Sequence, residues 1–187
     1  MFRDVVLPKR SIEDMHRLVS EVSYIMRLAT EEEIECAKYY DGDVFKVFLN
    51  CARSIGVPIP SELHSTMFPV LESLSELKEH FKMPRPEKIA KHLGRKLPRT
   101  PITKWTRSYS YPSGHALISR YLAYTLSNQP SVSEAQRRAL FDFANRVGLS
   151  RVQLGVHTLQ DIREARRLVD ALFIQPSVPY VNCESCV

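Results

Sequence analysis

Apolar residues recur every three or four positions along most of this chain, and this spacing constrains the fold more than any other feature of the sequence. It is the period of an amphipathic helix, whereas a half-buried strand would alternate apolar and polar residues. Ser11 and Asp14 begin the first periodic segment in the pattern of a capping box. The same signals predict helices over residues 12–26, 30–56, 61–82, 86–93, 113–128, 133–147 and 157–173. The sequence therefore predicts an all-α, single-domain helical bundle.

The length and composition suit one globular domain. A chain of 187 residues with 44% hydrophobic content can bury a single sizeable core. We expect residues 1–175 to form the domain and residues 176–187 to form a C-terminal tail. No apolar run reaches the roughly 18–20 residues that a membrane span needs, and the first residues do not resemble a signal peptide. A soluble, cytoplasmic protein is expected, and the oligomeric state stays open.

The positive charge is concentrated in one segment. The chain carries a formal net charge of +5, yet no acidic residue lies between Glu87 and Glu134. This gap holds the basic residues Lys88, Lys91, Arg95, Lys96, Arg99, Lys104, Arg107 and Arg120. Five of the twelve prolines fall between Met83 and Pro112, which we expect to be one long basic loop around the short helix at 86–93. The pattern favours a local anion site over a generally cationic surface.

The four cysteines do not indicate a disulfide framework in a chain of this size. Cys36 and Cys51 lie in helical segments, where we expect buried thiols. Cys183 and Cys186 form a C-x-x-C pair near the C-terminus. Free thiols in a tail are the favoured interpretation of that pair, with a local disulfide or a metal as alternatives. No second pair completes a four-ligand zinc site, so no metal is expected.

The predicted loop ends in Pro112-Ser113-Gly114-His115, immediately before a helical segment. The first backbone N–H groups of a helix have no internal partner, and together with the helix dipole they favour an anion. Gly114 allows the backbone to approach a phosphate closely. His115 then stands where it could protonate a leaving group.

Two further groups supply cations and a nucleophile. Lys78 and Arg85 are seven residues apart, about two helical turns, and so can face one side and converge on a phosphoryl group. Arg151 adds another cation. His157 and Asp161 form an i, i+4 pair, predicted on one helix, in which the carboxylate keeps one imidazole nitrogen protonated. The other nitrogen is left free as a nucleophile.

In order and spacing, these three groups resemble the signature of the type 2 phosphatidic acid phosphatase (PAP2) / vanadium haloperoxidase superfamily. The matching patterns are Lys78-x6-Arg85-Pro86, Pro112-Ser113-Gly114-His115 and Ser150-Arg151-x5-His157-x3-Asp161. The resemblance implies a helical bundle in which His157 takes the phosphoryl group, Asp161 orients it and His115 protonates the leaving oxygen. It implies that the phosphoryl oxygens are held by Lys78, Arg85, Ser113, Gly114 and Arg151. It implies no metal or cofactor, although vanadate or phosphate could occupy the site.

The predicted function is a soluble, metal-independent phosphatase for small phosphomonoesters. Trp105, Tyr109 and Tyr111 stand among cations and could stack a nucleobase, so nucleoside monophosphates are a leading guess. Packing of these rings onto the bundle is the alternative. Other functions left open are a vanadium-dependent haloperoxidase, a lipid or pyrophosphate phosphatase, and a nucleic-acid binder that uses the basic loop. Nucleic acid is the less expected partner, because such binding would not need His157 or Asp161.

Overall fold

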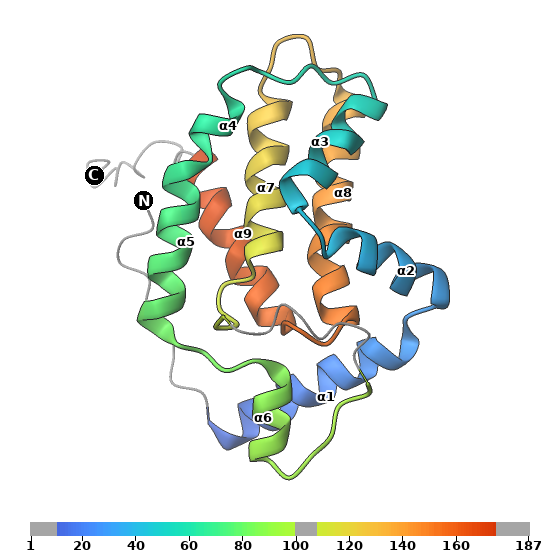
Figure 1. Cartoon of the computed structure of the whole chain (residues 1–187), viewed down its shortest axis with the longest axis vertical. Helices are drawn as coiled ribbons and strands as arrows, with labels where there is room; N and C mark the ends of the chain where they lie inside the picture. Colours follow the sequence, from blue (N-terminus) through green and yellow to red (C-terminus); the bar gives the residue numbers. More distant parts are fainter. Residues whose placement is uncertain (1–10, 100–107, 175–187) are drawn as a thin grey trace, which may run out of the picture.

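Every regular element in the described part of the chain is an α-helix. The computed structural model describes residues 11–99 and 108–174. The helices are α1 (Ile12–Leu28), α2 (Glu31–Tyr40), α3 (Val44–Ser54), α4 (Leu63–Thr66), α5 (Phe68–Phe81), α6 (Pro86–His92), α7 (Gly114–Ser127), α8 (Glu134–Gln153) and α9 (Leu159–Phe173). The predicted all-α bundle is confirmed (Figure 1).

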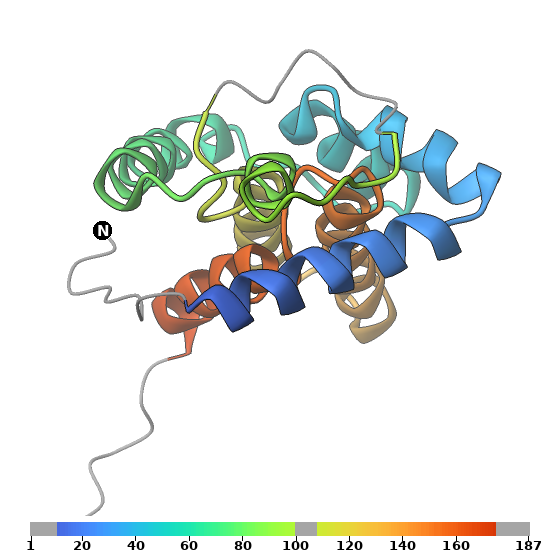
Figure 2. The ribbon, with the colours of Figure 1, turned by 90° about the horizontal axis from the view of Figure 1, so that it is seen from below.

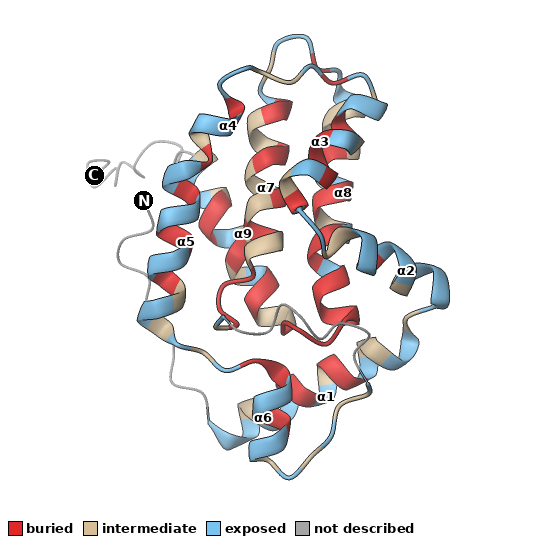
Figure 3. Ribbon diagram, in the orientation of Figure 1, coloured by how far each residue is buried: buried red, intermediate tan, exposed pale blue. Residues whose placement is uncertain are grey.

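Helix α7 lies at the centre of the bundle. It packs against α8, α9 and α3, while α5 runs along one flank (Figure 1). Helices α1 and α6 lie side by side across the lower end, where α1 also contacts α8 and α9 (Figure 2). Leu117, Leu122 and Leu126 of α7 are fully buried, and each such side chain contributes about 1.5–3 kcal/mol relative to an exposed one. Buried residues are frequent along α7, α8 and α9, whereas most of α2 is exposed (Figure 3).

Capping residues set several helix starts. The predicted Ser11–Asp14 capping box is present at α1. At α9, the Thr158 hydroxyl accepts from the Asp161 N–H at 3.1 Å, and the Asp161 carboxylate accepts from the Thr158 N–H at 2.8 Å. These bonds satisfy N–H groups that would otherwise lack a partner at the helix start. They also fix Asp161 before any functional role is considered.

The prediction of a single helix over residues 30–56 is wrong, because the structure has two helices there. Helix α2 ends at Tyr40 and α3 begins at Val44. The Asp41-Gly42-Asp43 turn separates them, and the Asp43 carboxylate accepts from the Lys46 N–H at 3.1 Å as the N-cap of α3. Asp and Gly favour such a break because they stabilise caps and turns more than helix interiors. The break brings Asp41 to the cavity described below.

Other boundaries also differ from the sequence prediction. The segment predicted as one bent helix over 61–82 is α4 followed by α5, with Pro69 in the first turn of α5. Helix α8 continues past the predicted end at 147 to Gln153. His157 precedes α9 and is not on it, because Thr158 is the N-cap. The predicted tail at 176–187, with Cys183 and Cys186, lies outside the described residues.

A left-handed glycine shapes the turn between α8 and α9. Gly155 has φ of 71°, a conformation that glycine adopts without strain. The His157 N–H bonds back to the Arg151 carbonyl at 3.2 Å across this turn. A Cβ atom on Gly155 would lie 2.6 Å from the Met26 sulfur of α1. The turn that places His157 therefore depends on the backbone freedom of glycine, and a larger residue would also displace the end of the Met26 side chain.

We expect Gly155→Ala to lower the free energy of unfolding by about 1–2 kcal/mol through left-handed strain, with an added loss from displacing Met26. Gly94→Ala is the matched control, since Gly94 has φ of 66° and nothing within 4 Å of an added Cβ. Urea unfolding of both variants separates the two contributions. Equal losses in the two variants would show that the Met26 contact carries no cost.

Candidate active site

A cavity of about 510 Å³ lies where several chain segments converge: the end of α5, the start of α6, the start of α7, the end of α8 and the α2–α3 turn. It is lined by Asp41, Gly42, Asp43, Lys78, Arg85, Ser108, Gly114, His115, Arg151 and His157. Six of the residues singled out from the sequence are in this set. Segments far apart in the sequence thus meet around one space, with three cations and two imidazoles on its wall.

His157 is held by a hydroxyl as well as by its predicted carboxylate partner. Its Nδ1 lies 3.6 Å from Oδ2 of Asp161, longer than a direct hydrogen bond. The Ser110 hydroxyl donates to the same Oδ2 at 2.7 Å and lies 3.4 Å from Nδ1. Because its proton is directed to Asp161, the Ser110 oxygen faces Nδ1 as an acceptor. Ser110 therefore links the imidazole to the carboxylate.

Arg85 determines which imidazole nitrogen carries the proton. Its Nη1 lies 2.9 Å from Nε2 of His157. A guanidinium group can only donate, so Nε2 is the acceptor and the proton of the neutral ring is on Nδ1. Nε2 thus carries the lone pair, as the resemblance implies for a nucleophile.

Burial and charge keep His157 neutral and Asp161 ionised. Burial, with Arg85 and Lys78 nearby, lowers the pKa of His157 to about 3 despite the opposing influence of Asp161. Burial alone would raise the pKa of Asp161, but the nearby His157 imidazole and hydrogen bonds from the Thr158 N–H and the Ser110 hydroxyl hold it below its ordinary range. At neutral pH the pair is therefore a neutral imidazole beside a carboxylate.

Lys78 and Arg85 do not share a helix, contrary to the spacing argument. Lys82 adopts φ of 46° at the end of α5, and Arg85 is the N-cap of α6. The predicted convergence nevertheless occurs, because both side chains line the cavity. Arg85 donates to the Ser108 carbonyl at 3.0 Å and to the Val156 carbonyl at 2.8 Å.

Lys78 is tied to the segment that precedes α7. Its ammonium group donates to the Tyr109 carbonyl at 2.7 Å and to the Pro112 carbonyl at 2.9 Å. Burial, with Arg85 as a second cause, lowers the pKa of Lys78 to about 7. An ammonium group has three N–H donors, so one remains for a ligand in the cavity.

His115 and Ser113 differ in their relation to the cavity. His115 lines it, and burial together with Arg151 lowers the pKa of His115 to about 3. Ser113 is fully buried and its hydroxyl accepts from the Ala116 N–H at 3.4 Å as the N-cap of α7. The described conformation thus uses the Ser113 side chain for capping, while Gly114 and His115 face the cavity.

The three aromatic residues proposed to stack a nucleobase do not form a platform in the described residues. Tyr111 is fully buried with its ring edge-on to Phe81 at 5.1 Å, so its predicted contact with substrate is wrong in this structure. Tyr109 is half-buried and contributes its carbonyl to Lys78. Trp105 lies outside the described residues. For Tyr111, packing onto the bundle is the correct interpretation.

Part of the basic segment lines a second cavity of about 690 Å³ that shares Arg85 and Val156 with the surroundings of His157. Its wall includes Lys91, Arg95, Lys96 and Arg99. Arg95 is anchored to α1, since it donates to the His16 carbonyl at 3.1 Å and to the Ser20 hydroxyl at 3.0 Å. The part of the basic segment up to Arg99 therefore lies beside the candidate site.

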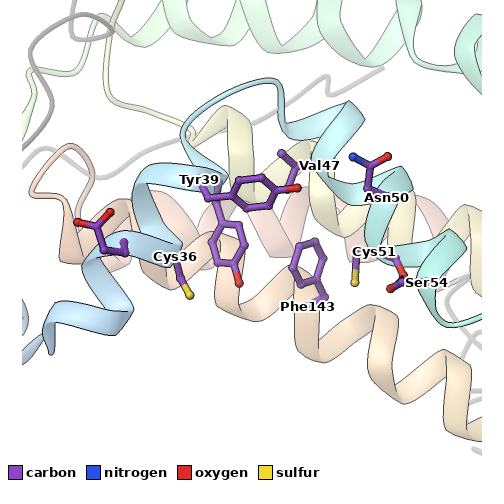
Figure 4. A pocket seen from close by; sticks show the side chains of 9 residues that line it. Cys36, Tyr39, Val47, Asn50, Cys51, Ser54 and Phe143 are labelled. Carbon is purple, nitrogen blue, oxygen red and sulfur yellow. Dashed lines mark hydrogen bonds between the residues drawn. The ribbon is translucent and has the colours of Figure 1, made fainter.

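Another cavity, of about 510 Å³, lies between α2, α3 and α8 and is lined by a different set of side chains (Figure 4). Tyr39, Tyr40 and Phe143 line it together with Cys36 and Cys51. Cys36 is exposed and Cys51 is partly exposed, so the expectation of two buried thiols is wrong. The wall of this cavity contains none of the cations or histidines discussed above.

Comparison with known proteins assigns the family. A bundle with three cations and two imidazoles around one cavity has the features expected of the phosphatase class that the motifs resemble. The PAP2 superfamily profile matches residues 64–166, more than half of the chain. The chain belongs to the PAP2 superfamily, which supports phosphatase activity.

A solved structure is similar in fold. The crystal structure of a transmembrane PAP2-type phosphatidylglycerolphosphate phosphatase from Bacillus subtilis matches with a TM-score of 0.61 and 19% identity. The match covers 88% of this chain and 84% of that chain. No curated protein matched the sequence. Among the described residues of this chain, none of the helices combines the length and the apolar character that crossing a bilayer requires.

Sequence reasoning missed Gly42 and Asp43 on the cavity wall, and three residues that contact the predicted site residues. Ser108 accepts from Arg85 at 3.1 Å, Ser110 links His157 to Asp161, and Asp41 pairs with Arg151. Single serines in a Pro-rich segment and an Asp within a predicted helix carry no distinctive spacing. The only available signal was the Asp41-Gly42-Asp43 run, which is typical of a turn.

Ser110→Ala should reduce kcat by about tenfold or more, because it removes the hydrogen bond to Asp161 and the acceptor facing Nδ1. Ser119→Ala is the matched control, since Ser119 is buried on α7 and bonds only to helix carbonyls. Rates of aryl phosphate hydrolysis by both variants test the role. Equal rates would exclude Ser110 as a link between His157 and Asp161.

Proposed function

We propose that this protein is a soluble, metal-independent phosphatase that hydrolyses small phosphomonoesters through a phosphohistidine on His157. The observation that carries the proposal is a neutral His157 whose Nε2 lone pair lies on the wall of a cation-lined cavity. A nucleophile with this tautomer and a set of fixed cations are what phosphoryl transfer requires of a protein. Family membership supports the reaction class.

In the first step the Nε2 lone pair of His157 attacks phosphorus and the bond to the leaving oxygen breaks. Protonated His115 gives its proton to that oxygen. In the second step a water attacks phosphorus and transfers one proton to the now neutral His115. The N–P bond then breaks, and its electron pair returns to Nε2. Inorganic phosphate leaves, and both histidines are restored.

Fixed positive charge would stabilise the transition state. Lys78, Arg85 and Arg151 line the cavity, and charge in phosphoryl transfer spreads over three equatorial oxygens. Arg85 can release Nε2 of His157 when a phosphoryl oxygen takes over its Nη1 donor. A bound phosphate dianion would also raise the pKa of His115 from about 3, so that the imidazole can act as an acid.

The second cavity supports an anionic substrate more than a nucleobase. No aromatic ring other than imidazole lines either of the two cavities within residues 11–99 and 108–174, whereas basic side chains line both. We therefore place small sugar or polyol phosphates beside nucleoside monophosphates as substrates. Phosphate release from nucleotides, sugar phosphates, pyrophosphate and short-chain lipid phosphates, with and without a chelator, tests both the substrate class and metal independence.

His157→Ala should lower kcat by about three orders of magnitude or more, because it removes the nucleophile. The control is His80→Ala, an exposed histidine near the end of α5. Rapid quenching of wild type with labelled substrate should trap an alkali-stable, acid-labile phosphoryl label that is absent from His157→Ala. Full activity in His157→Ala would refute the proposed nucleophile.

The reaction should weaken as pH rises through about 7. Lys78, whose pKa is lowered to about 7, is cationic below that pH and neutral above it. Phosphate binding and kcat/KM should therefore fall on the alkaline side. Lys78→Arg keeps its charge there and should move the fall to higher pH. An unchanged pH profile in Lys78→Arg would show that another group causes the alkaline fall in kcat/KM.

A further inference from the structure

The α2–α3 turn supplies a buried carboxylate to the candidate site. Oδ1 of Asp41 lies 2.6 Å from Nη1 of Arg151, and the two side chains are only 10% and 3% exposed. Surface ion pairs contribute little to stability, but a buried cation that loses its only counter-ion is strongly destabilised. Arg151 is in the last turn of α8, so this pair connects the N-terminal part of the chain to the wall of the cavity.

The same turn also reaches His115. Hydrogen bonding to the backbone of Asp41 and Gly42 favours the protonated form of the His115 imidazole, although burial and Arg151 outweigh it. Nε2 of His115 is buried and has no hydrogen-bond partner among the described residues. Nε2 is therefore not committed to another group of the described chain and is available for proton transfer. One turn therefore contacts both the cation and the imidazole on this side of the cavity.

Asp43 provides an internal comparison. It lies two residues further on and lines the same cavity, but its carboxylate caps α3 by accepting from the Lys46 N–H at 3.1 Å. Both residues place negative charge beside the cations, and of the two only Asp41 forms an ion pair with Arg151 in the described structure. A role that depends on the Arg151 contact can thus be separated from a general effect of charge.

We propose that Asp41 is a positioning residue that holds Arg151 in place as its counter-ion, and that a bound phosphoryl group shares the guanidinium with it. The inference rests on the proposed function, in which Arg151 binds a phosphoryl oxygen. Guanidinium groups have five N–H donors arranged as a fork, so a carboxylate and a phosphoryl group can occupy different edges. Asp41 would orient the guanidinium and also limit the positive charge that Arg151 adds to the cavity wall.

Removing the carboxylate should impair catalysis without weakening anion binding. In Asp41→Asn, Arg151 loses its fixed orientation, and kcat should fall by about tenfold or more. The cavity becomes more positive, so inorganic phosphate should inhibit at an equal or lower concentration than in wild type. A variant that was merely misfolded would lose phosphate binding together with turnover.

Phosphate should also take over as the counter-ion of Arg151. In phosphate-free buffer we expect Asp41→Asn to lower the melting temperature by about 6 °C or more. Added inorganic phosphate should stabilise Asp41→Asn by more degrees than it stabilises wild type. Asp41→Glu retains the charge and should restore a phosphate response close to that of wild type. Asp43→Asn retains Asp41 and an N-cap side chain, so its phosphate response should also stay close to that of wild type.

The experiment is a phosphate titration of the melting temperature and of kcat for wild type, Asp41→Asn, Asp41→Glu and Asp43→Asn, with Arg151→Gln alone and combined with Asp41→Asn. Asp41→Asn should have little further effect once Arg151 is replaced. Three results would overturn the proposal. Phosphate could raise the melting temperature of Asp41→Asn by no more than it raises that of wild type. Asp43→Asn could lose as much kcat as Asp41→Asn, or the effects of Asp41→Asn and Arg151→Gln could be fully additive. If Asp41→Asn folds only with phosphate, the proposal is supported, and failure to fold in both conditions counts against it.

The proposed function can fail separately. Wild-type protein without activity on any phosphate ester would refute the phosphatase proposal. The melting-temperature titration would still test whether Asp41 and phosphate compete for or share Arg151, because it needs no turnover.

Discussion

The candidate site depends on how one buried carboxylate, Asp161, is satisfied. Its Oδ2 accepts from both the Thr158 N–H and the Ser110 hydroxyl, and its backbone carbonyl accepts from the Ser113 N–H at 3.3 Å. The same residue therefore starts α9, anchors the segment before α7 and faces His157. An ionised carboxylate buried at 0% exposure persists only when such donors surround it. The start of α9 and the surroundings of the imidazole therefore depend on the same carboxylate.

The cations are held in a similar way by groups of the protein itself. Arg85 and Lys78 donate to backbone carbonyls, and Arg151 pairs with Asp41. The protein itself therefore holds these cations, and a phosphoryl group would displace His157 from Arg85 and use the remaining donors of Lys78 and Arg151. Such an arrangement fixes the cations in advance and reduces the reorganisation that accompanies the reaction.

Local signals predicted much of this structure, and tertiary contacts decided the rest. The capping box at Ser11 and the apolar periodicity located α1, and the Pro-Ser-Gly-His run correctly marked the start of α7. The break at Asp41 was missed because apolar residues continue at helical spacing on both sides of it. The link through Ser110 could not be predicted, since it depends on how the segment before α7 folds back on α9. The spacing of His157 and Asp161 identified the pair correctly for an incorrect reason, because His157 precedes the helix.

The α2–α3 turn has a consequence for how this domain can be divided. The family match begins at residue 64, whereas Asp41 and Gly42 line the cavity from outside that range. A fragment trimmed to the matched region would retain every signature residue and still lack the partner of Arg151. A chimaera with a relative would face the same difficulty, because α2 and α3 would have to be transferred together with the segment that contains Arg151. The part of the sequence that the family profile matches is therefore shorter than the part that contributes residues to the site.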